Sequence, residues 1–298
     1  MKRFLIMTAA ALGFVASQAH AQNFSDTSIG IRDGLTVSNP GGNFDDVVGK
    51  GTRNVNKVIL NLGHFDVWDY GTNFFNVDVL FSNPNEAATN SAGGSTEFYA
   101  VYRAQLSPDK IFGINTKFGP FTAINFEIGG DAEAENSTFA PDKKLLVAGP
   151  NFNIGLPAGF LNIGAHIEKE WNHNGIAGEL ISAGVPGPFE SSVSFSPTWE
   201  FEFVWLYSLK GLIGLPLDFK GFMNVVGPKG QTGFGGNTYI EILARPTLSL
   251  DIGTMIFNKP HKPDLYFSVE LWEHKFGNSD TLPGAEEVAP ELGIEMHF

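Results

Sequence analysis

The sequence predicts an all-β protein: a 12-stranded antiparallel transmembrane β-barrel formed by residues 22–298. Apolar and polar residues alternate one by one through most of the chain, which is the period of an extended strand with one apolar and one polar face. After the N-terminus, no apolar run reaches the roughly 18 residues that a transmembrane helix needs, so a helical membrane protein is excluded. Apolar residues make up 43% of the 298 residues, which excludes a disordered chain, and the absence of cysteine excludes disulfides and thiolate nucleophiles.

Residues 1–21 have the pattern of a secretory signal peptide. Lys2 and Arg3 precede an apolar run from Phe4 to Ala16, and small residues follow up to an expected cleavage site after Ala21. A short buried helix is the alternative. Removal of this segment moves the net charge from −13 to −15, which argues against binding nucleic acid by bulk electrostatics. Export without cysteines suits the cell outer membrane of a Gram-negative bacterium.

The alternation divides residues 22–298 into twelve segments of strand length. It is clearest from Glu291 to Phe298, where each polar or small residue is followed by an apolar one. Most segments have about 10 to 13 residues, the length at which a tilted strand crosses a bilayer, and an even number lets both chain ends lie on the periplasmic side. The predicted strands lie near residues 26–37, 55–66, 73–82, 96–107, 120–130, 144–155, 159–171, 192–206, 217–227, 238–250, 264–275 and 289–298.

The connections should differ in length on the two sides of the barrel. Tight turns at 69–71 and 156–159 fall on the periplasmic side, but the links at 107–119 and 251–263 are longer there and indicate bulges or helical turns. Longer polar links, rich in Gly, Asn, Asp and Pro, fall on the outer side at 38–54, 83–95, 131–143, 172–191, 228–237 and 276–288. Prolines inside the proposed strands remove ladder donors, so we expect bulges or altered strand edges at Pro150, Pro197 and Pro246.

A soluble β-sandwich or a lipocalin-like barrel also alternates, so membrane insertion needs separate support. The segments are longer than the roughly five or six residues of globular strands. The chain ends in Phe298 after apolar residues at 292, 294 and 296, like the C-terminal strand that the barrel-assembly machinery takes as a partner. Aromatic residues gather at strand ends, as in the girdles that face outer-membrane lipid: Trp68, Tyr70, Trp171, Trp205, Tyr207, Phe276 and Phe298.

If the apolar residues face lipid, the alternate residues face the lumen and are strongly acidic. Such a wall is wetted or internally paired, because a dry core makes many carboxylates costly, and each charge can have a purely structural role. The excess of acid predicts a weak preference for cations. The inward carboxylates are Asp78, Glu97, Glu127, Glu168, Glu170, Glu200, Glu202, Asp218, Glu241, Glu270, Glu291 and Glu295, and the inward cations are Lys57, Arg103, Lys220 and Arg245.

Several short motifs, in this order and spacing, resemble the nucleoside-specific channel-forming family of outer-membrane proteins, the Tsx-like porins. They are the turn at 66–71, the strand from 95 leading to Leu106 and Ser107, the segment 118–121, the turn at 155–157 with its strand to Trp171, and the terminal strand ending in Phe298. The resemblance covers most of the mature chain. It implies a twelve-stranded barrel for passive, substrate-selective diffusion of nucleosides through a narrow lumen lined by aromatic and ionisable side chains.

We therefore expect a passive outer-membrane diffusion channel for nucleosides or similar small polar solutes, monomeric or loosely oligomeric, with no cofactor. Aromatic rings suit stacking on a flat base, and amides and carboxylates suit hydrogen bonds to hydroxyls. A structural or adhesive barrel with a plugged lumen and no transport is the alternative. The candidate pore-lining residues are Glu97, Tyr99, Arg103, Glu127, Glu202, Glu241, Arg245, Tyr266, Glu270 and Trp272.

Two other arrangements suggest weaker hypotheses. His166, Glu168 and Glu170 share one strand face with His173 following, but a metal site needs a ligand from elsewhere as well. An outer-membrane hydrolase needs a serine and a histidine on the lipid-facing wall, and His64 has no outward serine at a matching height. We therefore expect neither a metal site nor an enzyme.

Overall fold

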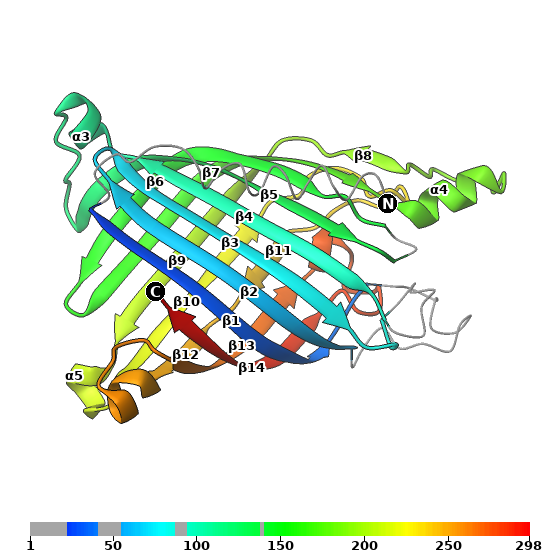
Figure 1. Ribbon diagram of the computed structural model, residues 1–298. Helices are drawn as coiled ribbons and strands as arrows, with labels where there is room; N and C mark the ends of the chain where they lie inside the picture. The colour runs from blue at the N-terminus through cyan, green and yellow to red at the C-terminus, as the bar shows by residue number, and fades with distance from the viewer. Residues whose placement is uncertain (1–22, 41–54, 87–93, 138–139) are drawn as a thin grey trace.

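The alternating segments pair in sequence order into one antiparallel sheet that closes on itself (Figure 1). The structure is a computed structural model that describes residues 23–40, 55–86, 94–137 and 140–298, so the predicted signal peptide lies outside the described residues. The strands are β1 (Phe24–Val37), β2 (Val55–Trp68), β3 (Gly71–Ser82), β4 (Thr96–Leu106), β5 (Phe121–Glu135), β6 (Lys144–Leu156), β7 (Gly159–His173), β8 (Ser192–Ser194), β9 (Thr198–Ser208), β10 (Leu217–Val226), β11 (Glu241–Ala244), β12 (Thr247–Asp251), β13 (Asp264–Glu273) and β14 (Glu287–His297).

These segments occupy twelve positions around the wall, as predicted. β8 and β9 both pair with β7, and Pro197 lies in the gap between them. β11 and β12 both lie between β10 and β13, and Pro246 lies in their gap. Pro150 stays within β6, but the pairing with β7 is interrupted between Ala148 and Asn151. The expected interruptions are confirmed, because a residue without an N–H cannot continue the ladder on that side.

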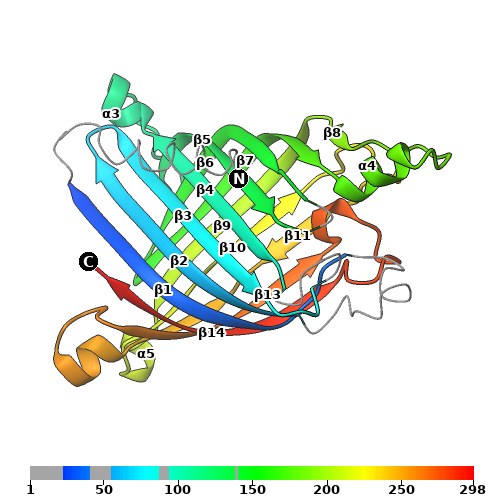
Figure 2. The ribbon, with the colours of Figure 1, turned by 45° about the vertical axis from the view of Figure 1, so that its right-hand side comes forward.

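The first and last strands close the barrel. β14 runs antiparallel to β1 from Ser28↔His297 to Gly34↔Glu291, and Figure 2 shows these two strands side by side. Closure pairs the two strands that would otherwise be the open edges of the sheet, and every backbone group in the ladder can then be satisfied without water.

The two faces of the wall are arranged as the alternation predicts. Ile167, Leu146 and Leu292 point outward with 68%, 59% and 56% of their surface exposed. Glu127 and Glu168 point inward with 1% and 2% exposed. Apolar side chains outside and charged side chains inside are the reverse of a soluble globular protein. This is the arrangement of a barrel whose outer face contacts lipid. Among the described residues, no helix has the length and apolar character needed to cross a bilayer.

The two ends of the barrel carry different connections. β1 begins and β14 ends on the side of the tight turns at 69–70 and 157–158, together with the short helices α3 (Pro108–Phe112) and α5 (Lys210–Ile213) and the π-helical turn Gly253–Phe257. The long links at 107–119 and 251–263 therefore contain helical turns, as expected. The other end carries α4 (Gly175–Ser182) and the 3-10 turn Lys275–Gly277. Parts of the outer links at 38–54 and 83–95 lie outside the described residues.

The predicted aromatic girdle is present only in part. Tyr70, Trp171 and Phe298 are exposed near strand ends. Phe276, however, belongs to the 3-10 turn, where its ring packs edge-on against Trp272 at 4.9 Å and lines the interior. Phe276 was wrongly placed on the lipid face, because the strand ends at Glu273 and the period of two does not continue into the turn.

Candidate functional site

The inward side chains of the barrel surround a cavity of about 1440 Å³. Its lining includes residues from both ends of the same strands: Phe24 and Val37 of β1, and Phe160 and His173 of β7. The cavity thus extends along the length of the barrel. Eighteen carboxylate residues and nine lysine or arginine residues line it, so the wall is acidic, with a lower ratio of acid to base than the twelve to four expected from sequence.

All ten candidate pore-lining residues lie on the wall of this cavity, but in different surroundings. They are Glu97 and Tyr99, Arg103, Glu127, Glu202, Glu241, Arg245, Tyr266, Glu270 and Trp272. Their position follows from strand alternation. Whether any of them contacts a solute stays a prediction, which depends on whether the side chain is held by a partner.

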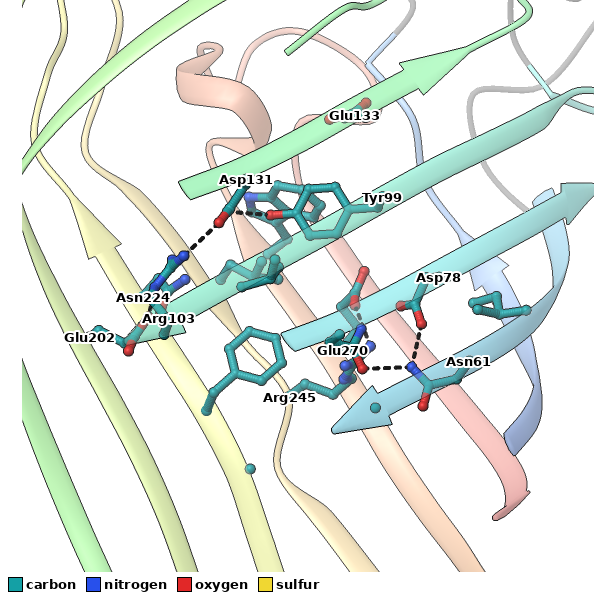
Figure 3. Close-up of a pocket in the computed structure, with 18 of the residues that line it drawn as sticks. Asn61, Asp78, Tyr99, Arg103, Asp131, Glu133, Glu202, Asn224, Arg245 and Glu270 are labelled. Carbon is teal, nitrogen blue, oxygen red and sulfur yellow. Dashed lines mark hydrogen bonds and ion pairs between the residues drawn. The ribbon is translucent and has the colours of Figure 1, made fainter. Parts of the chain in front are cut away.

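Arg103 is held firmly by acidic neighbours from other strands (Figure 3). Its Nη1 donates to Asp131 Oδ1 at 2.6 Å, and its Nε donates to Glu202 Oε2 at 3.0 Å. Tyr99 also donates its hydroxyl to Asp131, at 2.7 Å. Arg103 and Glu127 are both buried, with 3.9 Å between the guanidinium and the carboxylate. This cluster fills one side of the lumen and leaves Arg103 little freedom to bind a solute.

A second buried arginine, Arg32 of β1, was missed by the sequence analysis. It binds Asp78 at 2.7 Å and Glu291 at 3.2 Å across the seam between the first and last strands. Asn61 donates to Asp78 at 2.6 Å, and Ser268 donates to Glu291 at 2.8 Å. The signal was present, because Arg32 follows an outward isoleucine and therefore faces the lumen by the same alternation.

Lysines from the connections bind acidic residues at the end of the barrel opposite the tight turns. Lys229, in the link between β10 and β11, binds Glu170 of β7 and lies 3.4 Å from Glu241 of β11. Burial by itself lowers the pKa of Lys229, but the Glu170 and Glu241 carboxylates outweigh it and raise the pKa above its ordinary value. Lys275 likewise binds Glu287 at 2.8 Å. The sequence analysis missed these lysines because link residues have no alternation to show their direction.

The most open ion pair in the middle of the lumen is Arg245 with Glu270. Their charged atoms are 3.7 Å apart, and the two side chains are 21% and 19% exposed. The guanidinium of Arg245 lies 5.1 Å from the Phe222 ring. Figure 3 shows Arg245 and Glu270 on the wall opposite Tyr99. An arginine with one loose partner and an aromatic ring beside it can hydrogen-bond and stack with a solute that enters.

Tyr266 and Trp272 line the same side of the lumen. Tyr266 is buried, and Trp272 donates its Nε1–H to Glu241 at 2.9 Å. The ammonium group of Lys275 lies 4.4 Å from the Trp272 ring. These contacts fix the indole at the edge of the cavity with one face already covered.

The histidines behind the metal and hydrolase hypotheses have the following neighbours. His166 is buried between Glu127 at 3.5 Å and Glu200 at 3.7 Å, and neither ring nitrogen makes a hydrogen bond. His173 instead contacts the carbonyl of Ala140 at 2.9 Å. His64 Nδ1 lies 2.8 Å from the hydroxyl of Thr27, so its neighbour is a threonine rather than a serine.

Comparison with known proteins gives only distant structural likenesses. No protein-family model matches the chain, and no curated protein matches it. The KdgM porin in complex with disordered oligogalacturonate is 10% identical with a TM-score of 0.45, covering 91% of this chain and 99% of that one. The translocator domain of the autotransporter NalP from Neisseria meningitidis is 10% identical with a TM-score of 0.43, covering 99% and 96%. The outer membrane protein OpdK from Pseudomonas aeruginosa is 9% identical with a TM-score of 0.38, covering 92% and 98%.

Proposed function

We propose that this protein is a passive diffusion channel of the Gram-negative outer membrane for small polar solutes, with nucleosides as the preferred class. The observation that carries the proposal is the polar cavity, which is lined by residues from both ends of β1 and β7 inside an apolar outer wall. A water-filled path along a barrel lumen lets solutes pass down their gradient without a cofactor or a source of energy.

The middle of the lumen supports the preference for nucleosides. Arg245 over Phe222, with Glu270 beside it, offers a flat cationic and aromatic surface for a base. Asn61 and Asn76 on the facing strands offer amide groups for ribose hydroxyls. The sequence resemblance to nucleoside-specific channels points the same way.

A plugged structural barrel is the competing function, and the buried ion-pair clusters around Arg32 and Arg103 favour it. Both clusters fill lumen space with side chains that satisfy one another. The two functions differ in one measurable property. A channel gives discrete conductance steps when the purified protein is inserted into a planar bilayer, whereas a plugged barrel gives none.

The nucleoside preference is tested by solute flux. Liposomes containing the protein should swell faster in uridine or adenosine than in a hexose of similar size, and nucleosides should reduce the single-channel current. Arg245→Ala should weaken that current block, whereas Val288→Ala, a change on the exposed outer face, should leave it unchanged. Conductance without any distinction between nucleosides and sugars would keep the channel and reject the nucleoside preference.

A further inference from the structure

At the end of the barrel where β1 begins and β14 ends, five polar residues that are scattered in sequence come together beside the pairing of these two strands. Asp264 begins β13, while Glu295 and His297 end β14. His261 comes from the link before β13, and Asp26 lies near the start of β1. One ligand atom from each of Asp264, Glu295 and His297 lies within 4.8 Å of the other two.

Two atoms of this group lack the partners that their burial requires, whereas Glu295 Oε1 and Asp264 Oδ2 already contact Lys220 and His261. Asp264 has only 4% of its side chain exposed, and its Oδ1 has no hydrogen-bond partner. The Nε2 atom of His297 is also buried without a hydrogen bond. It lies 4.0 Å from Asp264 Oδ2 and 3.5 Å from Glu295 Oε1. Two carboxylates and an imidazole nitrogen therefore come together at one point, where a cation would satisfy the unpaired Nε2 atom.

Asp26 fixes the orientation of the His297 ring. Its Oδ2 lies 2.7 Å from His297 Nδ1, which turns Nε2 towards Asp264 and Glu295. With the proton on Nδ1, the lone pair of Nε2 would be available to a cation. A carboxylate behind a histidine in this way is the usual support of a histidine that binds a metal. Asp251, in contrast, is occupied with Thr254 and the backbone N–H of His261, so it shapes the link rather than offering a ligand.

We propose that Asp264, Glu295 and His297, with His261 as a fourth ligand, form a binding site for one divalent transition-metal ion such as Zn²⁺. Metal–ligand bonds of about 2.0–2.1 Å at tetrahedral angles place neighbouring ligand atoms roughly 3.3–3.4 Å apart. The distance of 3.5 Å needs to shrink by about 0.1–0.2 Å and that of 4.0 Å by about 0.6–0.7 Å. His261 Nδ1 is already 2.8 Å from Asp264, and its ring centroid lies 5.5 Å from that of His297.

Mixed imidazole and carboxylate ligands favour zinc, cobalt or nickel over magnesium, which prefers six oxygens. The ion would bind residues of β13 and β14 directly and contact β1 through Asp26. It would therefore stabilise the pairing of β1 with β14 that closes the barrel. The site also lines the cavity, at the end opposite the one where Lys229 and Lys275 lie. This inference does not depend on the proposed transport function.

Lys220 of β10 competes with a metal ion for Glu295, so its replacement tests the proposed site. Its ammonium group binds Glu295 in the present structure, and its side chain is 28% exposed, so it can turn away into the lumen. Because the ammonium competes with the cation for the same carboxylate, Lys220→Met should increase the affinity for Zn²⁺.

The experiment is a titration of the untagged protein in detergent micelles, with Zn²⁺ followed by calorimetry and Co²⁺ followed by its visible absorption. We expect one Zn²⁺ per chain, no heat with Mg²⁺, and a higher thermal unfolding midpoint with Zn²⁺. His297→Gln and Asp264→Asn should abolish binding, and Asp26→Asn should weaken it by about 10- to 100-fold. His274→Gln, at the opposite end of the barrel, is the matched control and should bind normally.

Correct folding of each variant is checked by its heat-dependent mobility on a gel. If the wild-type chain takes up no Zn²⁺, or if Asp264→Asn and His297→Gln fold and bind it like the control, the metal site is rejected. Should neither variant fold, Lys220→Met decides: an affinity for Zn²⁺ no higher than that of the wild type overturns the site.

Discussion

Single charged residues inside this barrel differ mainly in how completely their neighbours satisfy them. Arg103 is buried among Asp131, Glu202 and Glu127, whereas Arg245 keeps one loose contact with Glu270. A buried ion pair gains little over an apolar core, but removal of one member leaves an unpaired buried charge. The same residue type therefore has a structural role at position 103 and remains available to a solute at position 245.

Replacement of Arg103 by alanine should destabilise the barrel by about 3–5 kcal/mol, because three carboxylates lose their shared cation. Arg245→Ala should cost only about 0–1 kcal/mol, because its ion pair is longer and partly exposed. Urea unfolding in lipid vesicles, followed by tryptophan fluorescence, measures both free energies. Equal costs for the two variants would contradict the distinction between structural and accessible arginines.

At the scale of the strand, period-two alternation sets the facing of each side chain, and proline sets where the ladder stops. Pro197 and Pro246 each divide one wall position into two segments. The alternation continues in register across Pro246, whereas the pairing with β7 shifts by one residue across Pro197. The sequence located these interruptions. It did not locate the inward lysines of the connections, because a link has no repeating orientation from which direction can be inferred.

The outward face of β14 allows a test of its contact with lipid. Leu292 lies in the middle of the strand and is exposed, whereas Met296 lies one residue from its end. Leu292→Lys should destabilise the folded barrel by about 2–4 kcal/mol in bilayers, and Met296→Lys by only about 0–1 kcal/mol, because the cost of a charge falls from the bilayer centre to its surface. Unfolding titrations in vesicles measure the difference. A stable Leu292→Lys variant would show that this face does not contact acyl chains.

For the whole molecule, the acidic surplus of the lumen governs which ions enter it. Eighteen carboxylate residues and nine basic ones line the cavity, so the potential inside is negative even after the buried pairs are formed. The additional basic residues lower the ratio of acidic to basic side chains below the twelve to four that the sequence alone suggested. The electrostatic potential of the lumen should therefore make cations permeate somewhat better than anions, without excluding anions.

The corresponding measurement is the reversal potential across a bilayer in a potassium chloride gradient. We expect a permeability ratio of potassium to chloride above one, which declines as salt is raised because screening weakens the field. Lys229→Gln, which removes a buried cation near the outer mouth, should increase the ratio. Anion selectivity of the wild-type protein would contradict the charge balance of the lumen.

The local order of residues by itself determined the strands, their faces, their number and the positions of the proline breaks. This was possible because the direction of a side chain along an extended strand depends only on its own position in the repeat. The tertiary structure decided which charges meet. Arg103 and Glu202 are separated by 99 residues, and Arg32 and Glu291 by 259. Contacts across a lumen depend on strand register and barrel closure, so Asp264 and His297 become neighbours only after β13, β14 and β1 have joined.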